Sequence, residues 1–187
     1  AAYGPDHPQV AAMLINLGGL HLRLGAPEQA EAPYREALAI REATLGVRHA
    51  DVAQPLEGLA DSFEERGLLV EAERHQRRAL AIRRGALGPT HPRVALSLLL
   101  LADIVKGQER LDQAVAMQRE AVTLRANAFG ETDARTAYAQ VLLAETLADL
   151  GDTRQARMLA AASLDVFRAR MDADSSRALA LLTGLDA

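Results

Sequence analysis

The chain has 187 residues, of which 49% are hydrophobic and 3% aromatic, and its formal net charge at pH 7 is −4. It contains no cysteine, which excludes disulfide bonds and thiolate metal sites. The small negative charge argues against a nucleic-acid-binding protein. The apolar stretch from Val94 to Val105 is twelve residues long and contains Asp103, so it is too short to cross a membrane. We therefore expect a cytoplasmic protein that binds neither membranes nor nucleic acids.

One short sequence pattern returns every 42 residues. Its clearest copy runs from Gly88 to Ala95, with counterparts that start at Gly4, Gly46 and Gly130, and a degraded copy starts at Asp172. Internal repetition of this kind is typical of solenoid proteins. We therefore predict a single array over residues 1–187 that ends in a capping helix at 172–187, with residues 1–3 matching the end of a preceding repeat. The predicted units are residues 4–45, 46–87, 88–129 and 130–171.

Each copy of the pattern is expected to end one helix and to start the next. The glycine that opens it suits the left-handed backbone conformation that often ends a helix. Three residues later comes a side chain that can accept hydrogen bonds from the first free amides of the next helix. These predicted caps are His7, His49, His91, Asp133 and Ser175. Pro8 and Pro92 follow at the first helical position, where proline is well tolerated.

Between two copies, each unit shows two helical runs separated by a break. In the first unit Val10, Leu14 and Leu17 recur at helical spacing, residues 25–27 break the run, and a second run contains Tyr34. Two repeat positions hold small residues throughout, which predicts a closely packed antiparallel helix pair. They are Gly18, Ala60, Ala102 and Ala144 in the first helices, and Ala30, Ala72, Ala114 and Ala156 in the second.

Two places depart from this pattern. In the third unit Glu109 replaces the glycine found between the helices of the other units, and Gly107 is expected to serve in its place. The segment from Asp174 to Leu185 keeps only the first helix of a fifth unit. We expect it to cover the last apolar face of the array, as the terminal helices of solenoids do.

This combination of positions resembles the tetratricopeptide repeat (TPR), whose usual period is about 34 residues. The residues that carry the resemblance in the first unit are Leu17, Gly18, His21, Ala30, Tyr34 and Ala37. The 42-residue period and the phrase from Gly88 to Pro92 resemble the kinesin-light-chain-like subclass. The resemblance implies an all-α, right-handed TPR solenoid of four antiparallel helix pairs plus a C-terminal capping helix.

In TPR proteins the first helix of each unit lines a concave groove in which ligands usually lie. The candidate groove residues that the resemblance implies are Asn16, Arg23, Glu57, Asp61, Glu64, Leu96, Leu99, Leu100, Asp103, Tyr138, Val141, Leu142 and Glu145. Some TPR proteins grip a C-terminal carboxylate with basic residues, and kinesin light chains bind acidic, tryptophan-containing peptides. This chain departs from both patterns because its groove positions keep Asn16 and little positive charge.

Acidic residues outnumber basic ones on the predicted groove helices. The acidic residues are Glu57, Asp61, Glu64, Glu65, Asp103, Glu145 and Asp149, against Arg23 and Lys106. Such a field favours a basic or neutral ligand and repels an acidic one. The alternative is that these carboxylates form an ordinary solvated helix surface.

Residues 94–102 are apolar on nearly all faces of the predicted helix, which is typical of a helix that is covered on every side. Leu98 and Leu101 are expected in the core. Leu96, Leu99 and Leu100 then face the groove, where we expect them to join Tyr138, Val141 and Leu142 in one apolar patch. An exposed patch of this kind often marks a binding surface. The alternative is that another part of the protein covers it.

Two further clusters are not expected to form functional sites. The arginines 74, 77, 78, 83 and 84 fall on a second helix and are interpreted as a solvated face. His7, His49 and His91 lie at equivalent repeat positions, and packed helices are about 8–10 Å apart. They cannot share a metal ion whose bonds to nitrogen are about 2.0–2.1 Å long. With no catalytic or phosphate-binding motif either, we expect no enzyme activity and no cofactor.

The leading hypothesis is a non-enzymatic protein–protein interaction scaffold that binds a peptide or a partner helix in its concave groove. The partner is expected to be basic or neutral and to place apolar anchors on the third and fourth units and positive charge near the second. The alternative is a structural, self-associating segment of a larger signalling or effector protein, because bacterial 42-residue TPR arrays often accompany such domains.

Overall fold

The computed structural model describes residue 4 and residues 7–170 and 175–185, and this part of the chain is helical with no β-strand. The chain forms two compact units, Ala1–Pro89 and Thr90–Ala187. The N-terminal unit holds α1 (Pro8–Arg23), α2 (Pro27–Leu45), the 3-10 turn η1 (Ala50–Val52), α3 (Ala53–Glu65) and α4 (Leu69–Leu87). The C-terminal unit holds α5 (Pro92–Gly107), α6 (Leu111–Phe129), α7 (Ala134–Asp149), α8 (Thr153–Arg170) and α9 (Ser175–Leu185).

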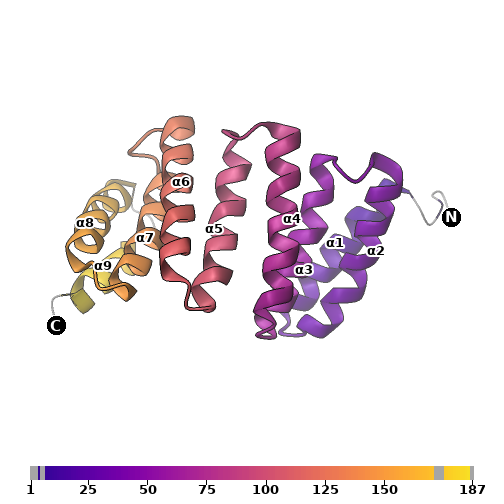
Figure 1. Ribbon diagram of the computed structural model, residues 1–187, viewed down its shortest axis with the longest axis horizontal. Helices are drawn as coiled ribbons and strands as arrows, with labels where there is room; N and C mark the ends of the chain where they lie inside the picture. Colours follow the sequence, from indigo (N-terminus) through magenta and orange to yellow (C-terminus); the bar gives the residue numbers. More distant parts are fainter. Residues whose placement is uncertain (1–3, 5–6, 171–174, 186–187) are drawn as a thin grey trace. The chain divides into compact units, whose positions relative to one another are not determined.

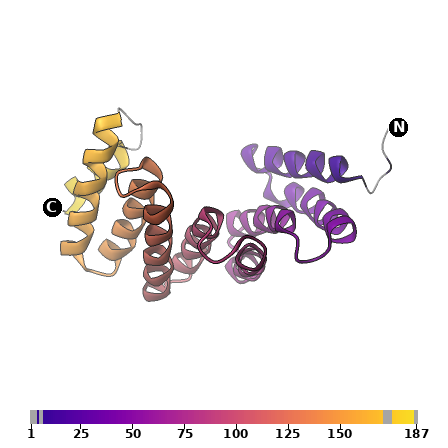
Figure 2. The same cartoon turned by 90° about the horizontal axis from the view of Figure 1, so that it is seen from above.

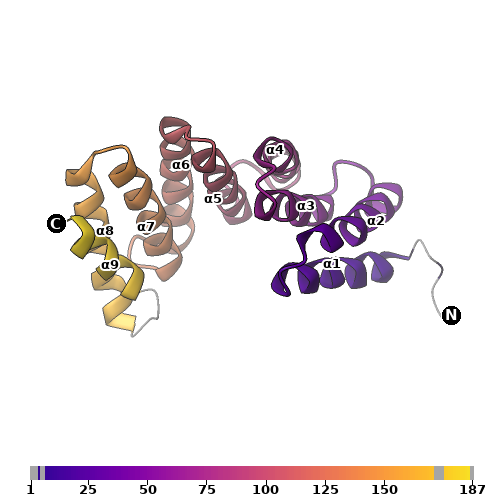
Figure 3. The ribbon, with the colours of Figure 1, turned by 90° about the horizontal axis from the view of Figure 1, so that it is seen from below.

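The eight longer helices form four pairs, α1/α2, α3/α4, α5/α6 and α7/α8, and the two helices of a pair lie side by side in opposite directions (Figures 1, 2 and 3). In the C-terminal unit α9 follows and packs against α8 and α7 (Figure 3). The predicted all-α architecture of four antiparallel pairs and a C-terminal capping helix is therefore confirmed. Residues 1–3, 172–174 and 186–187, which the sequence assigns to a preceding repeat and to the ends of the cap, lie outside the described residues.

The predicted cap side chains stand at the starts of the helices. Each accepts a hydrogen bond from the backbone N–H two residues further along the chain, over 2.9–3.2 Å. These caps are His7, His49, His91 and Asp133. The histidines accept through Nδ1, which satisfies one of the free amides of the first helical turn. The side chain of Ser175, the fifth predicted cap, lies outside the described residues.

The glycines that end the second helices adopt a conformation more restricted than the predicted left-handed one. Gly46, Gly88 and Gly130 have φ of 87°, 89° and 97°, as expected, but ψ of 150°, 153° and 156°. This combination of positive φ and extended ψ is essentially open to glycine alone. The prediction therefore identifies the correct glycines and the correct sign of φ. It is wrong about ψ, which is extended rather than left-handed helical.

Glu109 itself makes the turn between α5 and α6. Its φ is 62°, in line with 68° at Gly25 and 72° at Gly67 in the corresponding turns. Gly107 is the last residue of α5, so the expectation that it replaces the missing glycine is wrong. A non-glycine residue in this region costs about 1–2 kcal/mol, because its Cβ approaches the neighbouring carbonyl.

The small repeat positions are buried in both units, as predicted. The large position before them is less uniform. Leu59, Leu101 and Leu143 are at most 5% exposed, whereas Leu17 is 42% exposed. α1 packs against α2 and α3, and Leu17 lies on another face of this helix.

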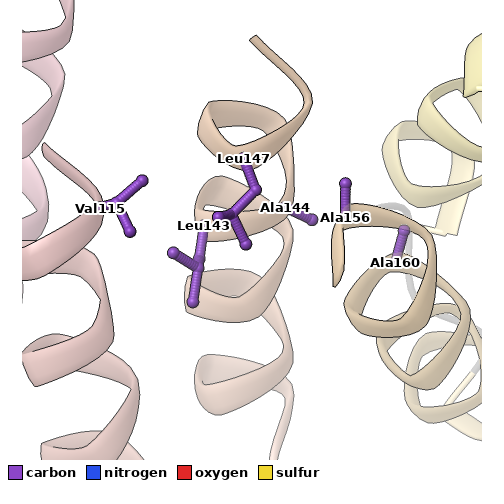
Figure 4. Close-up of a cluster of buried hydrophobic side chains, with 6 residues drawn as sticks. All are labelled: Val115, Leu143, Ala144, Leu147, Ala156 and Ala160. Atoms are coloured by element: carbon purple, nitrogen blue, oxygen red, sulfur yellow. The ribbon is translucent and has the colours of Figure 1, made fainter. Parts of the chain in front are cut away.

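The C-terminal unit has a core in which α7 lies between α6 and α8 (Figure 4). Leu143 points toward Val115 of α6, whereas Ala144 points toward Ala156 of α8 (Figure 4). Leu181, Leu182 and Leu185 of α9 pack against the same cluster. Arg157 of α8 also donates a hydrogen bond to the carbonyl oxygen of Leu185, over 2.7 Å. These contacts attach α9 to the end of the unit.

Candidate interaction surface

A pocket of about 170 Å³ lies in the C-terminal unit, mostly between α5 and α7, the first helices of its two pairs. Its lining consists of Leu96, Leu99, Leu100 and Asp103 from α5, Gln118 from α6, Tyr138 and Leu142 from α7, and Arg177 from α9. Six of these eight are candidate groove residues of the sequence analysis. The structure thus brings six of the thirteen candidate residues together in one pocket.

The wall of this pocket is largely apolar. Leu99 is buried, Leu100, Tyr138 and Leu142 are half-buried, and Leu96 is 41% exposed. Leu98 and Leu101, on the opposite side of α5, belong to the core as predicted. The run of apolar residues in α5 therefore serves two surfaces, one in the core and one at the pocket.

Gln118 gives the pocket a buried polar group. Its residue is 3% exposed, and its Oε1 has no hydrogen-bond partner among the described residues. A buried carbonyl oxygen left without a donor costs about 1–3 kcal/mol. Such groups are uncommon in folded proteins and call for an explanation. A ligand that donates a hydrogen bond would remove this cost.

Arg177 closes one side of the pocket and is already engaged. Its Nε and Nη2 donate to the two carboxylate oxygens of Glu145 over 2.5 and 2.6 Å, a bidentate arrangement. This bond to Glu145 raises the pKa of Arg177 further above its ordinary value. The guanidinium carbon also lies 5.7 Å from the centroid of the Tyr138 ring. Glu145 is therefore an ion-pair partner within the unit rather than a free groove carboxylate.

Val141 does not line the pocket, contrary to the expectation from the sequence. It is 1% exposed and packs with Leu164 and Phe167 of α8 and with Ala178 of α9. Val141 and Leu142 are consecutive, and one residue step turns a helix by about 100°. Since Leu142 faces the pocket, Val141 faces the core.

The acidic candidate residues of the N-terminal unit lie on α3, and a neighbouring arginine neutralises part of their negative charge. Glu57 forms an ion pair with Arg83 of α4 over 2.5 Å. Arg83 is 8% exposed, so the interpretation of the whole arginine cluster as a solvated face is wrong at this residue. Burial, and then the neighbouring carboxylates of Glu57 and Glu65, raise the pKa of Asp61 to about 6.

The remaining candidates of this unit are placed as follows. Glu64 is half-buried on α3, and Asn16 and Arg23 are exposed on α1. In the C-terminal unit Lys106 pairs with Asp149 over 2.6 Å. Within the described ranges, Asp103 forms no ion pair and is exposed. The acidic excess of the candidate set is therefore smaller than the sequence suggests, and Asp103 is the carboxylate that the pocket leaves uncompensated.

In the N-terminal unit Tyr34, which lies 84 residues before Gln118, occupies the same repeat position. The Tyr34 side chain is buried between α1 and α3. A Cβ atom on Gly18 would come within 2.7 Å of the ring, and one on Gly58 would overlap it. The aromatic ring thus occupies the space that two glycines leave free.

Sequence reasoning missed Gln118 and Arg177. For Gln118 a signal exists, because a polar residue replaces Tyr34 at a repeat position whose burial the helical pattern predicts. Arg177 belongs to the degraded fifth copy, where the repeat pattern no longer says which residues face the neighbouring helices.

The described part of the chain offers neither a membrane-spanning helix nor a cluster of metal ligands. No helix there is apolar over a length sufficient to cross a membrane. The same residues bring no three His, Asp or Glu side chains together in a way that could hold a metal ion.

Comparison with known proteins connects this geometry to a family. The tetratricopeptide repeat model matches residues 1–43, 51–127 and 107–169. No curated protein matches the chain by sequence. Among solved structures, nearly identical TPR-like repeats assigned to a kinesin light chain of Podosopora anserina align with a TM-score of 0.81 and 20% identity, over 96% of this chain and 86% of theirs.

BtubC (BKLC) from P. vanneervenii aligns with a TM-score of 0.83 and 25% identity, over 94% of this chain and 72% of its own. The apo form of RapI aligns with a TM-score of 0.78 and 13% identity, and this chain spans 48% of its length. These similarities show a shared fold of kinesin-light-chain-like TPR repeats. Because the family model also matches most of the sequence, the chain belongs to the tetratricopeptide repeat family.

Proposed function

We propose that this chain is a protein-interaction module that binds an extended peptide or a partner helix on the surface formed by α5 and α7. TPR repeats generally mediate protein–protein interactions, and their scaffold is typically non-enzymatic. The pocket lined by Leu96, Asp103 and Leu142 is the observation that supports the proposal most strongly. It combines an apolar wall with a few polar groups, as ligand sites usually do.

The partner is proposed to be basic or neutral, with an apolar side chain placed against Leu96 and Leu100. Asp103 is exposed at this pocket. Carboxylates at a binding surface disfavour acidic partners, because bringing like charges together costs free energy. The basic residue of the described pocket lining, Arg177, is paired with Glu145, so it is not available to bind an acidic segment.

Selection from a phage-displayed library of random peptides against the whole chain tests this function. Leu96→Glu places a charge on the exposed part of the pocket wall, and Leu179→Glu is its control because Leu179 is 44% exposed on α9. We expect peptides that bind the native chain and Leu179→Glu but lose at least tenfold in affinity for Leu96→Glu. Absence of enriched peptides, or binding that ignores Leu96→Glu, would contradict the proposal. Circular dichroism checks that both variants are folded.

Self-association is a second candidate, favoured by an exposed apolar row on α1. Met13, Leu17 and Leu20 share one face of this helix, Leu24 follows directly after its end, and all four are exposed. Exposed apolar surface of this kind can bind a second copy. Light scattering over a range of concentrations tests the idea. A dimer that Leu20→Glu dissociates supports it, whereas a monomer at all concentrations rules it out.

A further inference from the structure

We propose that the pocket between α5 and α7 receives an arginine or lysine side chain of the bound peptide, with Asp103 and Gln118 as its acceptors. The inference rests on the proposed function, because it specifies the chemistry of the same pocket. It follows from three features of the lining: its charge, its unsatisfied polar atom and its apolar wall.

The charge of the pocket is unbalanced. Arg177 is the basic residue of the lining, and Glu145 binds its guanidinium through two hydrogen bonds of 2.5 and 2.6 Å. Asp103 has no such partner among the described residues. Arg177, Glu145 and Asp103 together carry one net negative charge, which lies on the side of Asp103. An incoming cation would be attracted there, and an incoming carboxylate would be repelled.

The unsatisfied atom is also an acceptor. Gln118 lines the pocket, and its buried Oε1 receives no hydrogen bond from the described part of the chain. Arginine and lysine side chains carry only donors, whereas aspartate and glutamate carry only acceptors when ionised. An apolar side chain would leave Oε1 unpaired, and an acidic one would face two acceptors. A neutral donor such as serine or asparagine would bond to Gln118 but would leave the charge of Asp103 unbalanced, so a basic side chain is the type that satisfies both groups.

The apolar wall fits the rest of such a side chain. Arginine and lysine lay their methylene stems along apolar surface and keep the charged end near polar groups. Leu96, Leu100 and Leu142 offer that surface beside Asp103 and Gln118. The pocket therefore provides a matching place for both ends of one long basic side chain.

The test uses the strongest peptide whose binding depends on Leu96, titrated calorimetrically against the whole chain. Each arginine in it is replaced by citrulline and each lysine by norleucine, which keep the length of the side chain and remove its charge. We expect one replacement to weaken binding to the native chain about tenfold, the size typical of a lost hydrogen bond to a charged group. The same replacement should change binding to Asp103→Asn by less than about twofold, because the coupled charge is already absent.

Two further variants separate a binding role from a structural one. Asp165→Asn removes an exposed carboxylate from α8 and should leave the affinity unchanged. Gln118→Met removes the acceptor with little change in volume, and it should weaken peptide binding without lowering the melting temperature. A Gln118 with only a structural role would not alter the affinity in a variant that remains as stable as the native chain.

The outcomes distinguish this inference from the function on which it rests. Selected peptides without a basic residue, or a citrulline effect of equal size in Asp103→Asn, overturn the basic-pocket assignment and leave the peptide-binding function in place. Selected peptides that ignore Leu96→Glu, or no enrichment at all, overturn both.

Discussion

The two units fill the space between their own first helices in different ways. In the N-terminal unit Tyr34 fills the space between α1 and α3, and Gly58 on α3 makes room for its ring. In the C-terminal unit the equivalent residues are Gln118 and Leu142, and a pocket opens beside them between α5 and α7. The N-terminal unit thus pairs a large residue, Tyr34, with Gly58, whereas the C-terminal unit pairs the smaller Gln118 with Leu142.

This difference indicates that two repeat positions, those of Tyr34 and Gly58, determine whether the space between successive first helices is filled or open. The helices, their caps and the small positions are alike in both units. A buried polar amide in place of the aromatic ring adds no packing benefit in the free chain, since its oxygen is unpaired. A glutamine, Gln76, also stands at this repeat position in α4 of the N-terminal unit, so the residue type alone does not mark a site. The binding role that we propose for Gln118 rests on its place in the pocket wall.

The largest effect is expected when the N-terminal unit is given the leucine of the other unit. Gly58→Leu should lower the free energy of unfolding by about 3 kcal/mol, because even a Cβ at this position overlaps the Tyr34 ring. Urea unfolding followed by circular dichroism measures it. Gly85→Leu is the control, since a Cβ there meets no atom within 4 Å, and leucine should stabilise α4 by up to about 1 kcal/mol.

The double variant Gly58→Leu with Tyr34→Gln sharpens the comparison, because it recreates the pair found in the C-terminal unit. Its loss should be smaller than that of Gly58→Leu alone, since the overlapping ring is gone. Additive losses would show that the two positions are not coupled and that the exchange has no bearing on how the space is used.

Removing the charge of Asp61 should stabilise the chain. Asp61 lies at the repeat position of Asp103, but burial and the carboxylates of Glu57 and Glu65 raise its pKa from 3.8 to about 6. The folded state binds this proton more tightly, so the free energy of unfolding falls as the pH rises from about 4 to 6. Asp61→Asn should be more stable than the native chain by about 1–2 kcal/mol at pH 7, and the difference should shrink toward pH 4.

The comparison between variant and native chain is needed because His75 titrates with the opposite sign. Burial, and then Arg74, lower the pKa of His75 from 6.5 to about 4. Its contribution to stability is therefore lost as the pH falls from about 6.5 to 4. Denaturation of both proteins at several pH values isolates the Asp61 effect. A constant difference between pH 4 and 7 would contradict the raised pKa.

Placing glycine in the turn between α5 and α6 should relieve the backbone strain of this turn, because the corresponding turns of the N-terminal unit carry glycine. Glu109→Gly should stabilise the chain by about 1 kcal/mol, because Glu109 has a φ of 62° that glycine adopts without strain. The thermal midpoint measures this change. The control Gly67→Glu, in the corresponding turn of the N-terminal unit, should lower the midpoint by a similar amount. Opposite signs would mean that neither turn is strained by a side chain.

The smallest expected effect concerns the pocket itself. Gln118→Met should raise the free energy of unfolding by up to about 1 kcal/mol, since it removes a buried unpaired oxygen. Asp103→Asn, at an exposed position, should change it by less than about 0.5 kcal/mol. Chemical denaturation at pH 7 gives both values. A loss of stability in Gln118→Met would show that the amide has a structural role in the core.

The helices and most of the pocket could be predicted from local sequence. Glycine and cap recur in fixed order, with proline after the cap in two copies, and each of them determines a helix end by its own backbone chemistry. Leu96, Leu100 and Leu142 were found because the repeat register places them on first helices. Such a register cannot distinguish Val141 from Leu142, because that choice depends on the rotation of α7 against α8 and α9. Gln118 was missed although its repeat position predicts burial, whereas Arg177 was missed because its place depends on tertiary packing.

One titration tests the central contrast most directly. We would record ¹H–¹⁵N spectra of the whole chain while adding n-butylguanidinium, a probe with an apolar stem and a cationic donor. The account predicts shifts in the amides of α5 and α7 and in the side-chain amide of Gln118, with none beyond background in α1 and α3, where Tyr34 fills the equivalent space. Equal shifts in both units, or shifts that bypass Gln118, would contradict it.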